Sequence, residues 1–109
     1  MPRELSDDEC VCAYLNDENV PVLCDLGTFL EWNPRNQERC QIRKDELNGW
    51  TVETCFSGMS FVQDGPPLFW KTVACPPRGQ RPREYKSGTL ENALMAHDFL
   101  LKEIRDGRV

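Results

Sequence analysis

The alternation of apolar and polar residues is clearest around Asn48-Gly49, a dipeptide that is typical of two-residue β-hairpin turns. Both residues tolerate the positive φ that a type I′ turn requires. The pattern therefore predicts two antiparallel strands, 40–47 and 50–57. A further apolar run, 68–75, predicts a third strand, and because this run is nearly continuous we expect it to be covered on both faces.

A two-residue turn also fixes which side chains of the hairpin share a face. On the face turned away from the core, Lys44 is expected opposite Glu53, a favourable pair of charges, and Ile42 opposite Cys55. The pairs expected on the core face are Leu47 with Trp50, Asp45 with Val52, Arg43 with Thr54 and Gln41 with Phe56.

The segment 89–106 predicts a helix that covers this sheet. Thr89 is a suitable N-cap, and Gly107 marks the exit from the helix. At 100° per residue its apolar side chains fall within one arc of about 120°, with the only histidine, His97, in the middle. The arc contains Leu90, Ala93, Leu94, His97, Leu100, Leu101 and Ile104. We therefore predict a two-layer α+β fold, in which an antiparallel meander of three or more strands is covered by a C-terminal helix.

The N-terminal part is expected to add less regular structure. Residues 1–24 predict an irregular arm or short strands, "CVCAYL" and "VPVLC", on either side of a polar turn. "DLGTFLEW", near 25–33, predicts a short helix that ends at Asn33-Pro34. The 109 residues fit a single domain, 1–109, with its sheet-and-helix core at 40–106.

Composition narrows the classes of function. The formal net charge of −5 argues against nonspecific nucleic-acid binding, because that binding depends on Lys and Arg meeting phosphates. No apolar stretch approaches the ~18–20 residues that span a bilayer. The N-terminal "MPRELSDDEC" lacks the apolar region of a secretory signal. We therefore expect an acidic cytoplasmic protein that binds neither nucleic acid nor membrane.

The six cysteines and the histidine leave four interpretations open, one of which is disulfide bonds between the cysteines. The favoured one treats the cysteines as buried thiols and His97 as a hydrogen-bonded core residue, with no cofactor and no catalytic residue. In another, His97 activates Cys55 or Cys75 as a nucleophile. The remaining interpretation is a zinc site that fixes the N-terminal arm to the core, although no usual zinc spacing is present. Its ligands would be Cys10, Cys12, Cys24 and His97.

Two segments have the composition of exposed loops. "PPRGQRPREYK" is the only dense basic cluster in this acidic chain, and it is interpreted as a solvated connector, with a loop that binds an anion or a protein partner as the alternative. The loop 58–67 follows the hairpin and contains the turn-forming sequence Asp-Gly-Pro-Pro. The candidate partner-binding residues are Asp64, Arg78, Arg81, Arg83 and Lys86.

Three blocks of sequence, "VETCFSG", "GPPLFWKTV" and "Y…TLENALMAH", follow one another along residues 50–97. They resemble a group of short phage and prophage proteins of uncharacterised activity, which read V-S-T-V-F-L-G, then G-P-P-L-L-F-E-T-M-V-F, then Y-x-T-W-E-E-A-x-x-G-H. The resemblance implies a compact α+β unit of mobile-element origin and implies no activity. Cys55 and Cys75 stand where those proteins have plain apolar residues, and Lys71 stands where they have an acidic one.

Together these interpretations predict a non-enzymatic accessory protein of a phage or other mobile element. It would act by binding an unidentified host or viral protein, as a monomer or a homodimer. The predicted partner surfaces are the two loops, 58–67 and 78–86. A zinc-stapled binding module and a small thiol enzyme are the alternatives.

Overall fold

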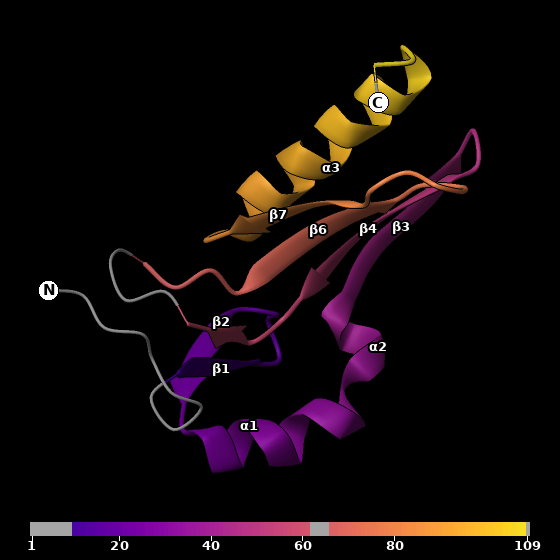
Figure 1. The fold of residues 1–109 in the computed structure, drawn as a ribbon. Helices are drawn as coiled ribbons and strands as arrows, with labels where there is room; N and C mark the ends of the chain where they lie inside the picture. Colours follow the sequence, from indigo (N-terminus) through magenta and orange to yellow (C-terminus); the bar gives the residue numbers. More distant parts are fainter. Residues whose placement is uncertain (1–9, 62–65, 109) are drawn as a thin grey trace, which may run out of the picture.

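The computed structural model describes residues 10–61 and 66–108. Two antiparallel sheets and a long C-terminal helix make up an α+β fold, as predicted (Figure 1). The larger sheet has the strand order β3-β4-β6-β7, and the smaller has the order β2-β1-β5. The strands are β1 (Val11–Leu15), β2 (Pro21–Cys24), β3 (Gln41–Leu47), β4 (Trp50–Phe56), β5 (Met59–Ser60), β6 (Trp70–Cys75) and β7 (Arg83–Ser87). The helices are α1 (Leu26–Trp32), α2 (Gln37–Cys40) and α3 (Leu90–Arg105), with a 3-10 turn, Asn33–Arg35, between α1 and α2.

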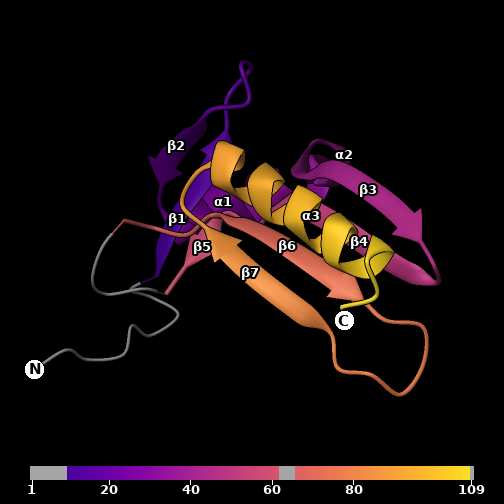
Figure 2. The same cartoon turned by 90° about the horizontal axis from the view of Figure 1, so that it is seen from above.

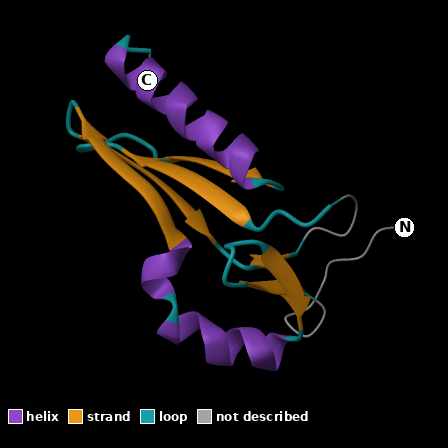
Figure 3. Ribbon diagram, turned by 180° about the vertical axis from the view of Figure 1, so that it is seen from behind, coloured by secondary structure: helices purple, strands orange, loops and turns teal. Residues whose placement is uncertain are grey.

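The helix α3 lies diagonally across one face of the larger sheet (Figure 2). The smaller sheet, α1 and α2 gather at one end of the larger sheet, below it in Figure 1 whereas α3 lies above it. The view from behind shows the same arrangement (Figure 3). Much of the sheet surface opposite α3 is therefore uncovered by any described element, and we call it the open face. Its side chains are those of Lys44, Glu46, Thr51, Glu53, Cys55, Lys71, Val73, Cys75, Glu84 and Lys86.

The hairpin between β3 and β4 follows the sequence pattern near its turn. Asn48 and Gly49 have φ angles of 51° and 84°, as a type I′ turn requires, and the pairs nearest the turn are as predicted. Between Gln41 and Arg43 the register shifts, because a β-bulge places an extra residue in β3. This bulge makes two predicted pairs wrong, Gln41–Phe56 and Ile42–Cys55, since Gln41 lies opposite Cys55.

The strand β6 is shorter than predicted and is covered on only one face. It begins at Trp70 and not at residue 68. The side chains of Trp70, Thr72 and Ala74 are buried, while Lys71 and Val73 between them are half-buried. The expectation of cover on both faces is therefore wrong, because the smaller sheet, α1 and α2 gather at one end of the larger sheet and leave most of that face uncovered.

The predicted amphipathic helix is confirmed. The side chain of Thr89 caps α3 by accepting a hydrogen bond from the amide of Asn92, at 3.1 Å. Gly107 follows the helix with a φ of 71°, a conformation that suits glycine at this position. The most deeply buried positions all belong to the predicted arc; they are Ala93, His97, Leu100 and Ile104.

The N-terminal arm forms short strands, one of the two expected outcomes, and it pairs with a segment that follows the hairpin. β1 pairs with β2 and also with β5, so residues 59–60 tie the arm to the rest of the chain. Gly58 has a φ of 71°, and its carbonyl accepts a hydrogen bond from the amide of Ala13 at 2.9 Å. A Cβ on Gly58 would clash with the ring of Phe29 in α1. The close approach of α1 and β1 to residue 58 therefore requires glycine here.

Candidate functional site

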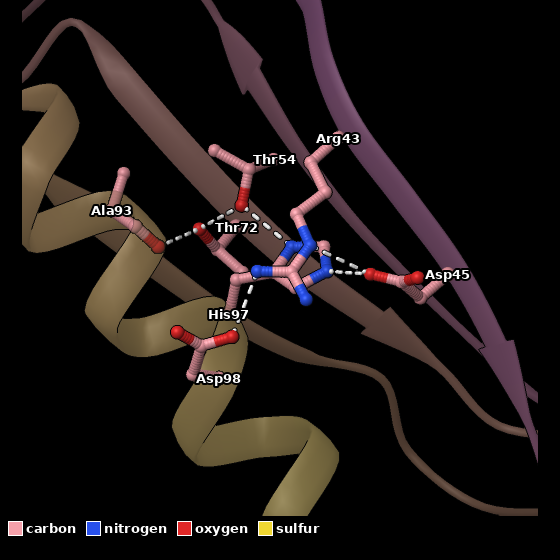
Figure 4. A network of polar contacts seen from close by, with 7 residues as sticks. All are labelled: Arg43, Asp45, Thr54, Thr72, Ala93, His97 and Asp98. Carbon is pink, nitrogen blue, oxygen red and sulfur yellow. Dashed lines mark hydrogen bonds and ion pairs between the residues drawn. The ribbon is translucent and has the colours of Figure 1, made fainter.

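The centre of the interface between α3 and the larger sheet is polar, and His97 occupies it (Figure 4). The His97 side chain has no exposed surface. Its Nδ1 lies 2.9 Å from Oγ1 of Thr54 in β4, and its Nε2 lies 2.8 Å from Oδ2 of Asp45 in β3. The prediction that His97 is a hydrogen-bonded core residue is therefore confirmed, since a buried imidazole needs partners for both nitrogens.

The direction of each hydrogen bond in this network can be assigned by counting protons. Thr72 donates its only hydroxyl proton to the carbonyl of Ala93, at 3.0 Å, because a carbonyl can only accept. Thr54, 2.8 Å from the Thr72 oxygen, must then donate its own proton to Thr72. It follows that Nδ1 of His97 donates to Thr54. Nε2 faces the carboxylate of Asp45, which can accept a hydrogen bond from it.

The partly exposed end of the network carries the matching charges. The hydrogen bond from His97, and to a smaller extent the guanidinium of Arg43, lower the pKa of Asp45, which keeps this carboxyl ionised. Arg43 donates to Asp45 at 2.8 Å and to Asp98 of α3 at 2.7 Å. The hydrogen bond to Asp98 is the main reason that the pKa of Arg43 is raised. Two side chains of β3 thus bind the middle of α3: Asp45 bonds to the buried His97, and Arg43 bonds to Asp98 at the surface.

The order hydroxyl, imidazole, carboxylate in Thr54, His97 and Asp45 matches the arrangement used in nucleophilic catalysis. Two observations argue against that use here. Thr54 is completely buried, so no substrate can reach its oxygen. In addition, Nδ1 of His97 already holds a proton and cannot take one from the hydroxyl. The arrangement is suited to fixing α3 on the sheet and not to activating a nucleophile.

The structure does not bring a cysteine to His97 as the thiol-enzyme alternative requires. Cys55 lies opposite Lys71, on the open face of the sheet, whereas His97 packs on the other face. Burial raises the pKa of the Cys55 thiol, which disfavours a thiolate. Cys75 is exposed at the end of β6.

The ligands of the zinc alternative are divided between two parts of the fold. The Sγ atoms of Cys10 and Cys12 lie 3.4 Å apart, and Cys24 is the cross-strand partner of Cys12. His97 belongs to the α3 interface, where both ring nitrogens are already bonded. Within residues 10–61 and 66–108 no three His, Cys, Asp or Glu side chains are grouped so as to hold a metal ion. Burial is also the main reason that the pKa of Cys12 is raised to about 12.

The predicted partner-binding residues occupy different kinds of structure. Asp64 lies outside the described residues. Arg78 and Arg81 lie in the connection between β6 and β7, as expected. The interpretation of the whole basic segment as a loop is wrong, because Arg83 and Lys86 belong to β7, where pairing with β6 makes the chain a strand.

The two segments that the sequence singled out meet at one place on the open face. An open cavity of about 450 Å³ is bounded by the residues after the hairpin, such as Phe61, and by β7. The complete lining is Ser57, Met59, Ser60, Phe61, Leu68, Lys71, Glu84 and Lys86. Lys71 also lines a neighbouring cavity of about 480 Å³, next to Cys55 and α2. The sequence predicted each segment separately, and the pairing of β6 with β7 is what brings them together.

Comparisons with protein-family models, with curated proteins and with solved structures found no match. Among the described residues, no helix is long and apolar enough to cross a membrane. The fold and the geometry of its surfaces are therefore the basis for a functional proposal.

Proposed function

We propose that this chain is a non-enzymatic accessory protein of a phage or other mobile element, and that it acts by binding a protein partner through the cavity on the open face. The observation that supports this most directly is the meeting of residues 59–61, Leu68 and β7 at that cavity. Loop segments positioned by a rigid sheet are common sites of recognition. We refer below to this cavity, lined by Phe61, Lys71 and Lys86 among others, as the open-face cavity.

The chemistry of the lining indicates what kind of segment would fit. Phe61 is 47% exposed and offers an apolar surface beside Leu68. Lys71 and Lys86 are direct cross-strand partners, a repulsive arrangement of like charges. Neither ammonium makes an ion pair with any described residue. A partner segment with an apolar side chain next to a carboxylate would cover Phe61 and relieve this repulsion.

The complete burial of Thr54, which closes the hydroxyl–imidazole–carboxylate network to substrate, is consistent with this function. The resemblance along residues 50–97 supports a mobile-element origin.

Site-specific photo-crosslinking tests the proposal. A benzophenone amino acid at position 61 should crosslink one dominant partner in cells, whereas the same group at Leu30, exposed on α1 away from the cavity, should not. The double substitution Lys71→Glu and Lys86→Glu should abolish the crosslink. Lys44→Glu, on the same open face but outside the cavity, should leave it intact. Equal crosslinking by the double variant and by wild type would rule out this cavity as the contact.

A further inference from the structure

The strand β7 forms an edge of the larger sheet, and no described strand lies on its outer side. It pairs with β6 along its whole length, from Arg83 to Ser87. It is the last strand in the order β3-β4-β6-β7, and no other described strand continues the sheet (Figure 2). Alternate residues of such an edge direct their N–H and C=O groups outward, where they can bond to another strand.

The sequence of β7 complements itself when it is read in the opposite direction. We propose that β7 pairs antiparallel with β7 of a second copy of this chain, around a two-fold axis at Tyr85. In this register Glu84 of each copy lies opposite Lys86 of the other, so two pairs of opposite charges form. Arg83 lies opposite Ser87, and the two Tyr85 residues meet at the axis.

The neighbouring symmetric registers lack this complementarity. A two-fold axis perpendicular to the sheet must pass beside one residue, because a shift by one residue would place side chains on opposite faces. An axis at Glu84 would oppose two glutamates, and an axis at Lys86 would oppose two lysines. Only the axis at Tyr85 brings unlike charges together and keeps like charges apart.

The two faces of β7 suit this pairing. Glu84 and Lys86 point to the open face, since they lie opposite Val73 and Lys71 of β6. Tyr85 lies opposite the buried Thr72, on the α3 face, yet it is 39% exposed. The aromatic ring is thus available to pack against its symmetry mate.

The other sheet edges are less suitable for self-pairing. β3 is bent by its bulge next to Arg43, and a symmetric pairing about its centre would oppose two copies of Lys44. Arg43 and Asp45 are already bonded to each other and to α3. β2 contains Pro21 and has only four residues. The proposal does not depend on the function proposed above, because self-association can be measured without a partner.

Charge exchange at the two positions tests the register. Glu84→Lys alone and Lys86→Glu alone each create two like-charge pairs per dimer, and each should weaken dimerisation about tenfold in analytical ultracentrifugation. The double variant Glu84→Lys with Lys86→Glu restores unlike pairs and should dimerise like wild type. Glu46→Lys, the same charge change on the β3 edge, should have no effect. Circular dichroism checks that all variants are folded.

Mixing the two single variants gives the sharpest result. In a heterodimer of Glu84→Lys with Lys86→Glu, both cross-strand pairs are again of opposite charge. Native mass spectrometry with one variant ¹⁵N-labelled should therefore show the heterodimer in excess over the statistical proportion. A statistical mixture, a double variant as weak as the singles, or a wild-type protein that stays monomeric at its highest soluble concentration would each overturn the proposal. In the last case Glu84 and Lys86 would act to keep the edge unpaired.

Discussion

Replacing Thr54 by valine tests the proton assignment in the buried network. The two side chains have nearly the same shape, so the change removes hydrogen bonds without leaving a cavity. The N–H of His97 is left buried without an acceptor, which costs about 1–3 kcal/mol, and Thr72 loses a neutral bond worth about 0.5–1.5 kcal/mol. We therefore expect Thr54→Val to lower the free energy of unfolding by about 2–4 kcal/mol, a large fraction of the 5–15 kcal/mol typical of a domain.

Urea denaturation measures this difference, and the same strand supplies the control. Thr51 lies on β4 but on the open face, where it is half-buried, so Thr51→Val should change the free energy of unfolding by about 0.5 kcal/mol or less. Nitrogen NMR of the His97 ring gives an independent test, since Nδ1 should carry the proton that is donated to Thr54. A bare Nδ1, or a Thr54→Val variant as stable as wild type, would refute the proton assignment.

Three further outcomes follow from the described contacts. The pKa of Asp45 is lowered in the folded protein, so the ionised carboxylate contributes its full stabilisation above about pH 4, the unfolded value, and loses it as the pH falls further. In urea titrations below about pH 4, wild type should therefore lose more free energy of unfolding than Asp45→Asn. Gly58→Ala should cost about 2–3 kcal/mol, measured by thermal denaturation. Gly79→Ala, at a φ of 70° but with open space around it, should cost less, and equal losses would rule out the steric clash as the cause. In timed alkylation at pH 8 followed by mass spectrometry, the exposed Cys75 should react before Cys12, whose thiol is held protonated by a pKa of about 12; the reverse order would contradict the burial of Cys12.

Local signals were sufficient to predict the hairpin and α3, whereas pairing over longer distances was not predictable. Asn48-Gly49 and the apolar arc of α3 are each contained in a few consecutive residues. The strand at 83–87 has no apolar alternation, and it exists because β6 supplies its hydrogen bonds. The bulge before Arg43 likewise leaves no trace in the pattern of apolar residues. Tertiary context overrides local preference at both places.

The buried network shows how far the sequence could lead toward a site. The predicted register places Asp45 and Thr54 on the core face of the hairpin, and the helical period places His97 at the centre of the apolar arc. Both expectations are confirmed. What the sequence lacked was the position of α3 along the strands, which decides that these three side chains meet. The face of Thr72 could not be predicted, because the run 68–75 does not alternate.

The two faces of the larger sheet differ in whether their polar and charged side chains are bonded within the fold. On the α3 face, the polar side chains of His97, Asp45 and Arg43 are each bonded within the fold. On the open face, Lys71 and Lys86 oppose each other without a carboxylate between them. If β7 pairs with a second copy as proposed, Lys86 gains Glu84 of that copy and Lys71 alone remains unbalanced beside the open-face cavity. Each cavity of the dimer would then bind a single partner carboxylate through Lys71, and the two cavities would lie on the same side of one continuous sheet.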